Sequence, residues 1–99
     1  MKKIVLFCGA GMSSSLLVLK IKDAAIAENY ECKVEAFSST NAQYAKDADI
    51  VLIVPQIRFN LKELQNELSC PVVVIEDDAY GSMNGVKILA QARKILKDE

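Results

Sequence analysis

The sequence predicts a single α/β domain built around a doubly wound, four-stranded parallel sheet. Two continuous apolar runs, Ile50–Val54 and Val72–Ile75, are typical of strands that are buried on both faces of a parallel sheet. Segments with the helical spacing of apolar residues lie between the strand-like runs, so that strands and helices alternate along the chain. The 99 residues fit one domain, residues 1–99, and 52% hydrophobic residues can fill one compact core.

The first half of the chain predicts two strands joined by a helix. A short apolar run indicates the first strand at Ile4–Phe7, and the second is expected at Cys32–Ala36, where apolar and charged residues alternate as in a half-covered edge strand. Between them, apolar residues recur at the i, i+4, i+7 and i+8 positions of a helix: Leu17, Ile21, Ala24 and Ala25. The serines at 13–15 are N-cap candidates for that helix.

The second half predicts three more helices around the two continuous apolar strands. Thr40–Lys46 begins with a capping-box pattern and is expected to form a short helix. Asn60 and Glu63 indicate a second capping box, at the start of a helix that reaches Leu68. A last helix is expected after Gly85, with this apolar stripe: Ile88, Ala92, Ile95 and Leu96.

The alternation of elements restricts the topology of the sheet. Right-handed crossovers place helices on both faces. If the second strand lies at an edge, the strand order is 2-1-3-4, and the switch point lies beside the end of the first strand. Cys8 is expected at that point, and the loop of residues 80–85 is expected at the same carboxyl edge.

Cys8 ends the first strand and is followed by a short loop that leads into a helix. The loop holds two glycines, three serines and a methionine: Gly9, Ala10, Gly11, Met12, Ser13, Ser14 and Ser15. Successive N–H groups of such a loop form an anion nest, and the helix N-terminus adds partial positive charge. This surrounding would stabilise a thiolate and offer donors to a phosphoryl group. The alternative is that Cys8 is a small buried hydrophobe and that the glycines make a tight turn.

Several other classes of site fit the sequence poorly. The chain has no histidine, which excludes a Cys-His pair and phosphohistidine chemistry within it. The closest alternative is a low-molecular-weight tyrosine phosphatase, which needs Arg at the sixth position after its cysteine, where this chain has Ser14. Asp77 and Asp78 faintly resemble the acid loop of that family. The loop has two of the three dinucleotide-binding glycines and no Gly-Lys-Ser/Thr. A non-catalytic anion-binding module remains a second hypothesis.

The lack of long apolar runs indicates an intracellular protein, and neither a cofactor nor a metal is expected. The 12 basic and 13 acidic residues give a net charge of -1, which does not favour binding to nucleic acid or anionic lipid. No apolar run is long enough to span a membrane, and the apolar run after the first lysines is too short for the hydrophobic region of a signal peptide. Cys32 and Cys70 are expected to be structural, and Asp77 and Asp78 to be solvated. Arg58 and Lys62 are expected to lie on an exposed face, and a role in docking a partner is the alternative to a merely solvated one.

Three segments together resemble the lactose/cellobiose-type IIB component of the phosphoenolpyruvate-dependent sugar phosphotransferase system. They are the string from Cys8 to Ser15, Val54–Gln56 after the third strand, and Tyr80–Gly85 before the last helix. The resemblance covers essentially the whole chain, and its fold is also similar to that of the low-molecular-weight tyrosine phosphatases. Two departures are mild: Ser14 replaces a frequent Thr, and Gly9 replaces a frequent Ser.

The resemblance implies a phosphoryl relay in sugar uptake. Cys8 would accept a phosphoryl group from a phosphohistidine of a IIA partner and pass it to a disaccharide of the cellobiose, chitobiose or lactose type, bound to the membrane IIC transporter. Residues 9–15 would form the phosphoryl-binding loop, with Gln56 and Tyr80 as neighbours. The resemblance also implies a cytoplasmic protein that associates transiently with the inner face of the membrane through IIC.

Overall fold

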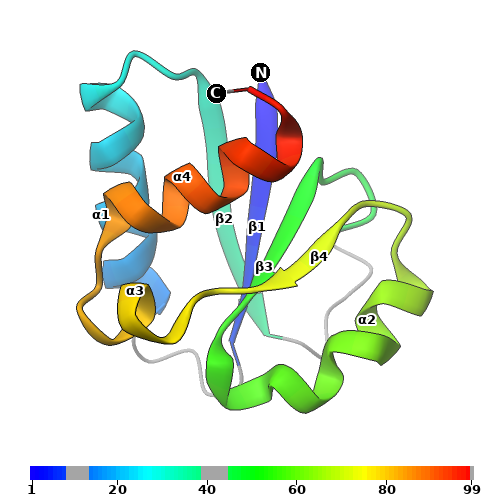
Figure 1. Ribbon diagram of the computed structural model, residues 1–99. Coiled ribbons are helices and arrows are strands. Elements are labelled where there is room, and N and C mark those ends of the chain that lie inside the picture. Colours follow the sequence, from blue (N-terminus) through cyan, green and yellow to red (C-terminus); the bar gives the residue numbers. More distant parts are fainter. Residues whose placement is uncertain (9–13, 39–44, 99) are drawn as a thin grey trace.

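The computed structural model describes residues 1–8, 14–38 and 45–98, which form the strands and helices shown in Figure 1. In chain order these elements are β1 (Lys2–Cys8), α1 (Ser14–Ala27), β2 (Cys32–Ser38), β3 (Ile50–Ile53), the 3₁₀ helix η2 (Pro55–Asn60), α2 (Leu61–Glu67), β4 (Val72–Val74), α3 (Asp77–Gly81) and α4 (Gly85–Leu96).

The four strands form one parallel sheet in the order β2-β1-β3-β4, which confirms the predicted 2-1-3-4 order. β1 and β3 are neighbours, but the chain leaves β1 toward β2 and leaves β3 toward β4. The carboxyl ends of β1 and β3 therefore mark the switch point of the sheet. In Figure 1 these carboxyl ends lie at the lower edge of the sheet, and the chain begins at the upper edge.

Helices cover both faces of the sheet. α1 and α4 lie against each other over one face (Figure 1), and α1 also contacts β2. α2 joins β3 to β4 in the direction opposite to the β1–α1–β2 connection, so a right-handed crossover places it on the other face. This arrangement is the predicted doubly wound fold.

The core follows the apolar runs of the sequence. Every residue of Ile4–Phe7 and of Ile50–Ile53 is 0% exposed, as expected for strands with helices on both faces. β2 is an edge strand, and there Val34 is buried whereas Lys33 is exposed. The central strands β1 and β3 therefore anchor the end of the sheet at which Cys8 lies.

Gly85 allows the first turn of α4 to approach α1 very closely. A Cβ atom built on Gly85 would lie 2.2 Å from the carbonyl oxygen of Lys20 and 2.9 Å from the amide nitrogen of Ile21. The contact is one of backbone against backbone, so a side chain at this position has no space. The close approach determines where α4 begins relative to α1.

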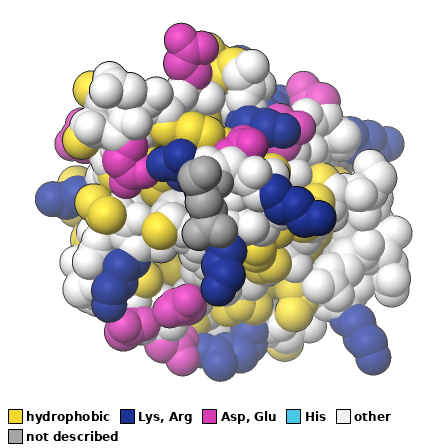
Figure 2. Space-filling view, turned by 45° about the horizontal axis from the view of Figure 1, so that its top comes forward, with side chains coloured by type: hydrophobic (Ala, Val, Ile, Leu, Met, Phe, Trp, Pro, Cys, Tyr) yellow, Lys and Arg dark blue, Asp and Glu magenta, His cyan; other side chains and the backbone are white. Residues whose placement is uncertain are grey.

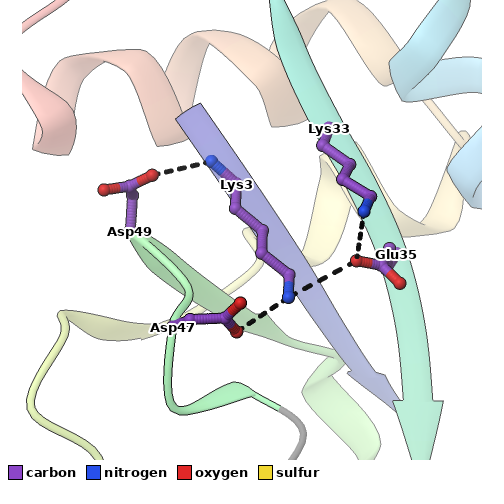
Figure 3. A network of polar contacts seen from close by, with 5 residues as sticks. All are labelled: Lys3, Lys33, Glu35, Asp47 and Asp49. Carbon is purple, nitrogen blue, oxygen red and sulfur yellow. Dashed lines mark hydrogen bonds and ion pairs between the residues drawn. The ribbon is translucent and has the colours of Figure 1, made fainter. Parts of the chain in front are cut away.

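A network of charged residues attaches the segment before β3 to the sheet (Figure 3). Lys3 Nζ lies 2.7 Å from Asp47 Oδ1 and 3.5 Å from Glu35 Oε1, which Lys33 Nζ also approaches at 3.7 Å. The backbone N–H of Lys3 donates to Asp49 Oδ2 at 2.7 Å. The Lys3 ammonium lowers the pKa of Asp47, and Asp47 in turn raises the pKa of Lys3. Residues 47–49 are thereby tied to β1 and β2.

Charges of both signs are interspersed over the face in Figure 2, which brings the upper edge of Figure 1 forward. Lys and Arg side chains alternate there with Asp and Glu, and apolar side chains lie between them. This mixture agrees with the net charge of -1. In the described ranges, which leave out 9–13, 39–44 and 99, no helix is long and apolar enough to cross a membrane.

Two predicted details of secondary structure were wrong, and a third is not tested. Residues 80–85 were expected to form a loop, but Tyr80 and Gly81 end the short helix α3 and Gly85 begins α4. The capping box at Asn60 was wrong, because its side chain makes no cap hydrogen bond and η2 runs directly into α2. Of the helix predicted at 40–46, residues 40–44 lie outside the described residues.

Candidate functional site

Cys8 is the last residue of β1 and is only 6% exposed. On one side it pairs in register with Ser38, the last residue of β2. On the other side the Phe7 carbonyl accepts a hydrogen bond from Val54 N at 3.1 Å, where β3 gives way to η2. Cys8 therefore lies at the switch point, where the strand order predicted it.

The segment after Cys8 leads into the N-terminus of α1. Gly9, Ala10, Gly11, Met12 and Ser13 lie outside the described residues, as does the side chain of Ser14. α1 begins at Ser14, and Ser15 is exposed in its first turn, which contains no acidic residue. The first N–H groups of a helix have no partner within the helix, and together with the helix dipole they favour an anion near the end of β1.

η2 carries Gln56 at the carboxyl end of β3. Pro55 opens this 3₁₀ helix, at a position where the lack of an N–H group costs no hydrogen bond. Ile57 is buried and anchors the segment, whereas Gln56 is exposed. Gln56 is thus placed at the same edge of the sheet as Cys8, with its side chain open to solvent.

α3 carries Tyr80 at the carboxyl end of β4. The helix is anchored by Ala79, which is 1% exposed, and Tyr80 is half-buried. Asp78 Oδ2 lies 3.1 Å from Lys87 Nζ of α4, and this hydrogen bond lowers the pKa of Asp78. The Ser82 hydroxyl donates to the Asp78 carbonyl at 2.8 Å. α3 is therefore fixed to the start of α4.

An ion pair that the sequence reasoning missed connects η2 with α3. Arg58 Nη2 lies 2.7 Å from Asp77 Oδ1, and Arg58 Nε donates to the Pro55 carbonyl at 3.0 Å. The sequence predicted that Arg58 is exposed and left a docking role open; the exposure is confirmed by its 59% exposed side chain. Among the residues of 1–8, 14–38 and 45–98, no group of three or more potential metal ligands gathers in one place.

Of the three predicted residues, Cys8 ends β1, whereas Gln56 and Tyr80 lie on the segments that follow β3 and β4. All three lie toward the carboxyl edge of the sheet (Figure 1). Sequence reasoning missed Ser38, because it ended the second strand at Ala36. The polar run that begins at Ser38 was the available signal, since it resembles the end of a strand at the carboxyl edge. The candidate site is therefore composed of the ends of all four strands.

Cys32 and Cys70 are free, half-buried thiols away from this edge. Burial raises the pKa of both thiols, so each is protonated to a higher pH than an ordinary cysteine. Cys32 and its neighbour Ile26 line a cavity of about 620 Å³ beside the start of β2. The seven residues of β2 separate that cavity from the Cys8 edge by about 20 Å, so it is not part of the candidate site.

Comparison with known proteins shows one family along almost the whole chain. The family model described as "PTS system, Lactose/Cellobiose specific IIB subunit" matches residues 3–91. The oligo-beta-mannoside-specific EIIB component of the PTS system of Bacillus subtilis (strain 168) is 40% identical over 103 residues, covering 100% of both chains. The galactose-specific EIIB component of Lactococcus lactis subsp. cremoris is 33% identical over 104 residues, with 96% of each chain covered.

A solved structure supports the same relationship. The solution structure of the cellobiose-specific phosphotransferase IIB component from Borrelia burgdorferi has a TM-score of 0.79 and 38% sequence identity to this chain. The match covers 98% of this chain and 93% of that one. The chain therefore belongs to the lactose/cellobiose-specific IIB subunits of the PTS, the sugar phosphotransferase system, and is a phosphotransferase component of that system.

Proposed function

We propose that Cys8 is the residue that carries the phosphoryl group. The thiolate attacks the phosphorus of a phosphohistidine on a IIA partner, so that an S–P bond forms as the N–P bond breaks. A hydroxyl of the sugar bound by IIC then attacks the phosphorus, so that an O–P bond forms as the S–P bond breaks. The Cys8 thiolate is released, and the hydroxyl proton goes to a base on the acceptor. The observation that supports this role best is the place of Cys8, at the switch point of the sheet and six residues before α1 begins.

The phosphoryl group would be held by the segment that follows Cys8. Gly9, Ala10, Gly11, Met12, Ser13, Ser14 and Ser15 supply successive backbone N–H groups and three hydroxyls. Phosphoryl transfer needs in-line positioning and neutralisation of charge more than a general base. A segment without histidine can therefore support it, with help from the N-terminus of α1. Gln56 and Tyr80 would contact the group or its carrier from the neighbouring strand ends.

A relay must keep its phosphoryl group away from water until the acceptor arrives. Residues 8–15 contain no arginine, so they lack the bidentate clamp on the phosphoryl group that a tyrosine phosphatase needs. This composition favours a carrier over a phosphatase. It also favours transfer to a partner that supplies its own catalytic groups.

The sugar is a disaccharide of the cellobiose, chitobiose or lactose type. The relatives are named for oligo-beta-mannoside and galactose, and the structural neighbour for cellobiose, although their chains are 33–40% identical to this one. Such spread among similar IIB chains agrees with a sugar choice made by IIC. The chain would act as one phosphocarrier domain in the cytoplasm, docking on IIC at the inner face of the membrane.

Intact-protein mass spectrometry tests this proposal. Wild type and Cys8→Ser are incubated with phosphoenolpyruvate, the general phosphotransfer proteins and a lactose-type IIA. We expect one added phosphoryl group on wild type only, and its loss when IIC membranes and a disaccharide are supplied. An anion-binding module without covalent chemistry would instead retain its phosphate affinity in Cys8→Ser. Wild type that stays unmodified beside phosphorylated IIA refutes the relay.

A further inference from the structure

Two neighbouring side chains of η2, Arg58 and Phe59, are open to solvent at the edge of the sheet where Cys8 lies. Phe59 is 77% exposed and the Arg58 side chain is 59% exposed. Their support is firm, because η2 begins next to the hydrogen bond from Val54 to β1 and is anchored by buried Ile57. A contact made by this pair would therefore be made at the carboxyl edge of the sheet, where β1 also ends.

The guanidinium of Arg58 is only partly used within the chain. Nε bonds to the Pro55 carbonyl at 3.0 Å and Nη2 to Asp77 Oδ1 at 2.7 Å, whereas Nη1 has no hydrogen-bond partner among the described residues. The Asp77 side chain is 72% exposed, so the ion pair lies in water and adds little net stability. An oxyanion on another molecule can compete with Asp77 for the guanidinium.

We infer that Arg58 and Phe59 dock the phosphoryl-donor protein beside Cys8, and that Asp77 competes with this donor for Arg58. The inference rests on the proposed function, because it requires a protein that delivers a phosphoryl group to Cys8. Arginine and aromatic side chains are the residues that most often dominate the binding energy of protein interfaces. The exposed pair on η2 combines both kinds.

The positive charge of Arg58 favours the phosphoryl donor over the phosphoryl acceptor as the protein that docks on this pair. A phosphoryl group carries about -1.5 to -2 charges near pH 7, and the donor brings it to the interface on its surface. The disaccharide that accepts the group is neutral. An exposed guanidinium at the edge of the site therefore favours the phosphorylated donor and adds less to contact with the sugar-loaded transporter.

The first test compares the initial rates at which variants gain the phosphoryl mass from limiting phosphorylated IIA. Arg58→Gln and Phe59→Ala are each expected to lower this rate by about tenfold. Both side chains are exposed, so both variants keep the wild-type melting temperature. Ile26→Ala is the matched control, because Ile26 is 75% exposed but lies at the far end of α1; its rate stays at the wild-type value.

A second variant is expected to load faster than wild type, which a purely structural role of the Arg58–Asp77 pair would not produce. Asp77→Asn frees Arg58 and is expected to raise the loading rate about threefold. The gain disappears when Arg58→Gln is combined with it, since it acts through Arg58. Asp78→Asn removes the same charge from a carboxylate paired with Lys87 and gives no gain. If the Arg58–Asp77 pair only held η2 to α3, Arg58→Gln and Asp77→Asn would both slow loading.

The experiment separates this inference from the function on which it rests. Wild type that never gains a phosphoryl group would refute the proposed function. Wild type that gains it while Arg58→Gln and Phe59→Ala load at the wild-type rate would refute only the docking role. Normal loading combined with slower discharge to IIC membranes would assign the pair to the acceptor, and would also overturn the inference.

Discussion

At the scale of single residues, Gly81 and Gly85 lie four positions apart and have opposite surroundings. A Cβ on Gly81 would meet no atom within 4 Å, whereas one on Gly85 would overlap the backbone of α1 at Lys20. Backbone cannot move aside as a side chain can. The identity of residue 85 therefore determines how closely α4 approaches α1.

We predict that Gly85→Ala lowers the free energy of unfolding by about 3 kcal/mol, near the upper end for overpacking. Gly81→Ala is the matched control and should raise it by about 0.5 kcal/mol, because alanine restricts the unfolded chain. Urea unfolding followed by circular dichroism measures both. Equal stabilities of the two variants would contradict the close packing at Gly85.

Cys32 and Cys70 should react slowly with alkylating agents. Burial raises the pKa of Cys32 and Cys70, so a smaller fraction of each is thiolate at neutral pH than in an ordinary cysteine. In Cys8→Ser, we therefore expect alkylation by iodoacetamide at pH 7.5 to be about tenfold slower than in the guanidine-unfolded protein. The rate should rise steeply toward higher pH. Alkylation of Cys32 at the unfolded rate would argue against its burial.

At the scale of elements, Gln91 of α4 attaches the end of β4 to the helix layer. Its Nε2 donates to the Val74 carbonyl at 2.9 Å, and its Oε1 accepts from the Glu76 N–H at 3.2 Å. One side chain thus satisfies both a donor and an acceptor at the end of β4 that leads to α3. Gln65 of α2 makes one such bond, to the Val72 carbonyl at 3.1 Å at the start of β4.

We predict that Gln91→Leu destabilises the protein by about 2 kcal/mol, because it leaves two backbone groups without a protein partner. Gln65→Leu removes one bond and should cost about 1 kcal/mol. Hydrogen exchange should show the larger loss of protection at residues 76–80 in Gln91→Leu. Equal protection of α3 in the two variants would show that Gln91 does not hold it.

The sequence predicted those elements whose pattern depends on burial alone. Ile4–Phe7 and Ile50–Ile53 were found because strands covered on both faces are apolar throughout. α3 was missed because a helix of five residues has no apolar period and is held by contacts with α4. The cap at Asn60 was wrong because the Leu61 N–H already bonds to the Arg58 carbonyl, so no free helix start exists there.

For the candidate site too, the sequence predicted some features and could not predict others. The topology of the sheet placed Cys8 at the carboxyl edge, and that needed only the order of strands and helices. The Arg58–Asp77 pair joins residues 19 positions apart. Their contact depends on how β3 and β4 align and on a helix, α3, that the sequence pattern does not indicate. Spacing along the chain therefore could not have predicted it.

At the scale of the whole molecule, a cluster at the amino edge of the sheet ties α4 and the end of the described chain to the segment between α1 and β2. The Tyr30 hydroxyl donates to Asp98 Oδ2 at 2.8 Å, and the Arg93 guanidinium lies 4.5 Å from the centre of the Tyr30 ring. Arg93 also bonds to Glu28 at 2.6 Å and to the Asp98 carbonyl. This edge is held by polar contacts between distant segments, whereas the opposite edge carries the candidate site.

The cluster predicts a specific response of stability to alkaline pH. Burial and the hydrogen bond to Asp98 raise the pKa of Tyr30 well above that of a free tyrosine. The folded protein therefore keeps this proton above pH ~10, where the unfolded chain loses it, so stability is complete below that pH and falls above it. Tyr30→Phe should be less stable by about 1–2 kcal/mol at pH 7 and should lose less stability between pH 9 and 11. Asp98→Asn, which keeps an acceptor without its charge, should fall between the two in slope. Urea unfolding across this pH range measures the free energy of unfolding of the three proteins, and differences between them remove the titration of lysines that all three share. Parallel curves of stability against pH would show that the fold does not retain the Tyr30 proton.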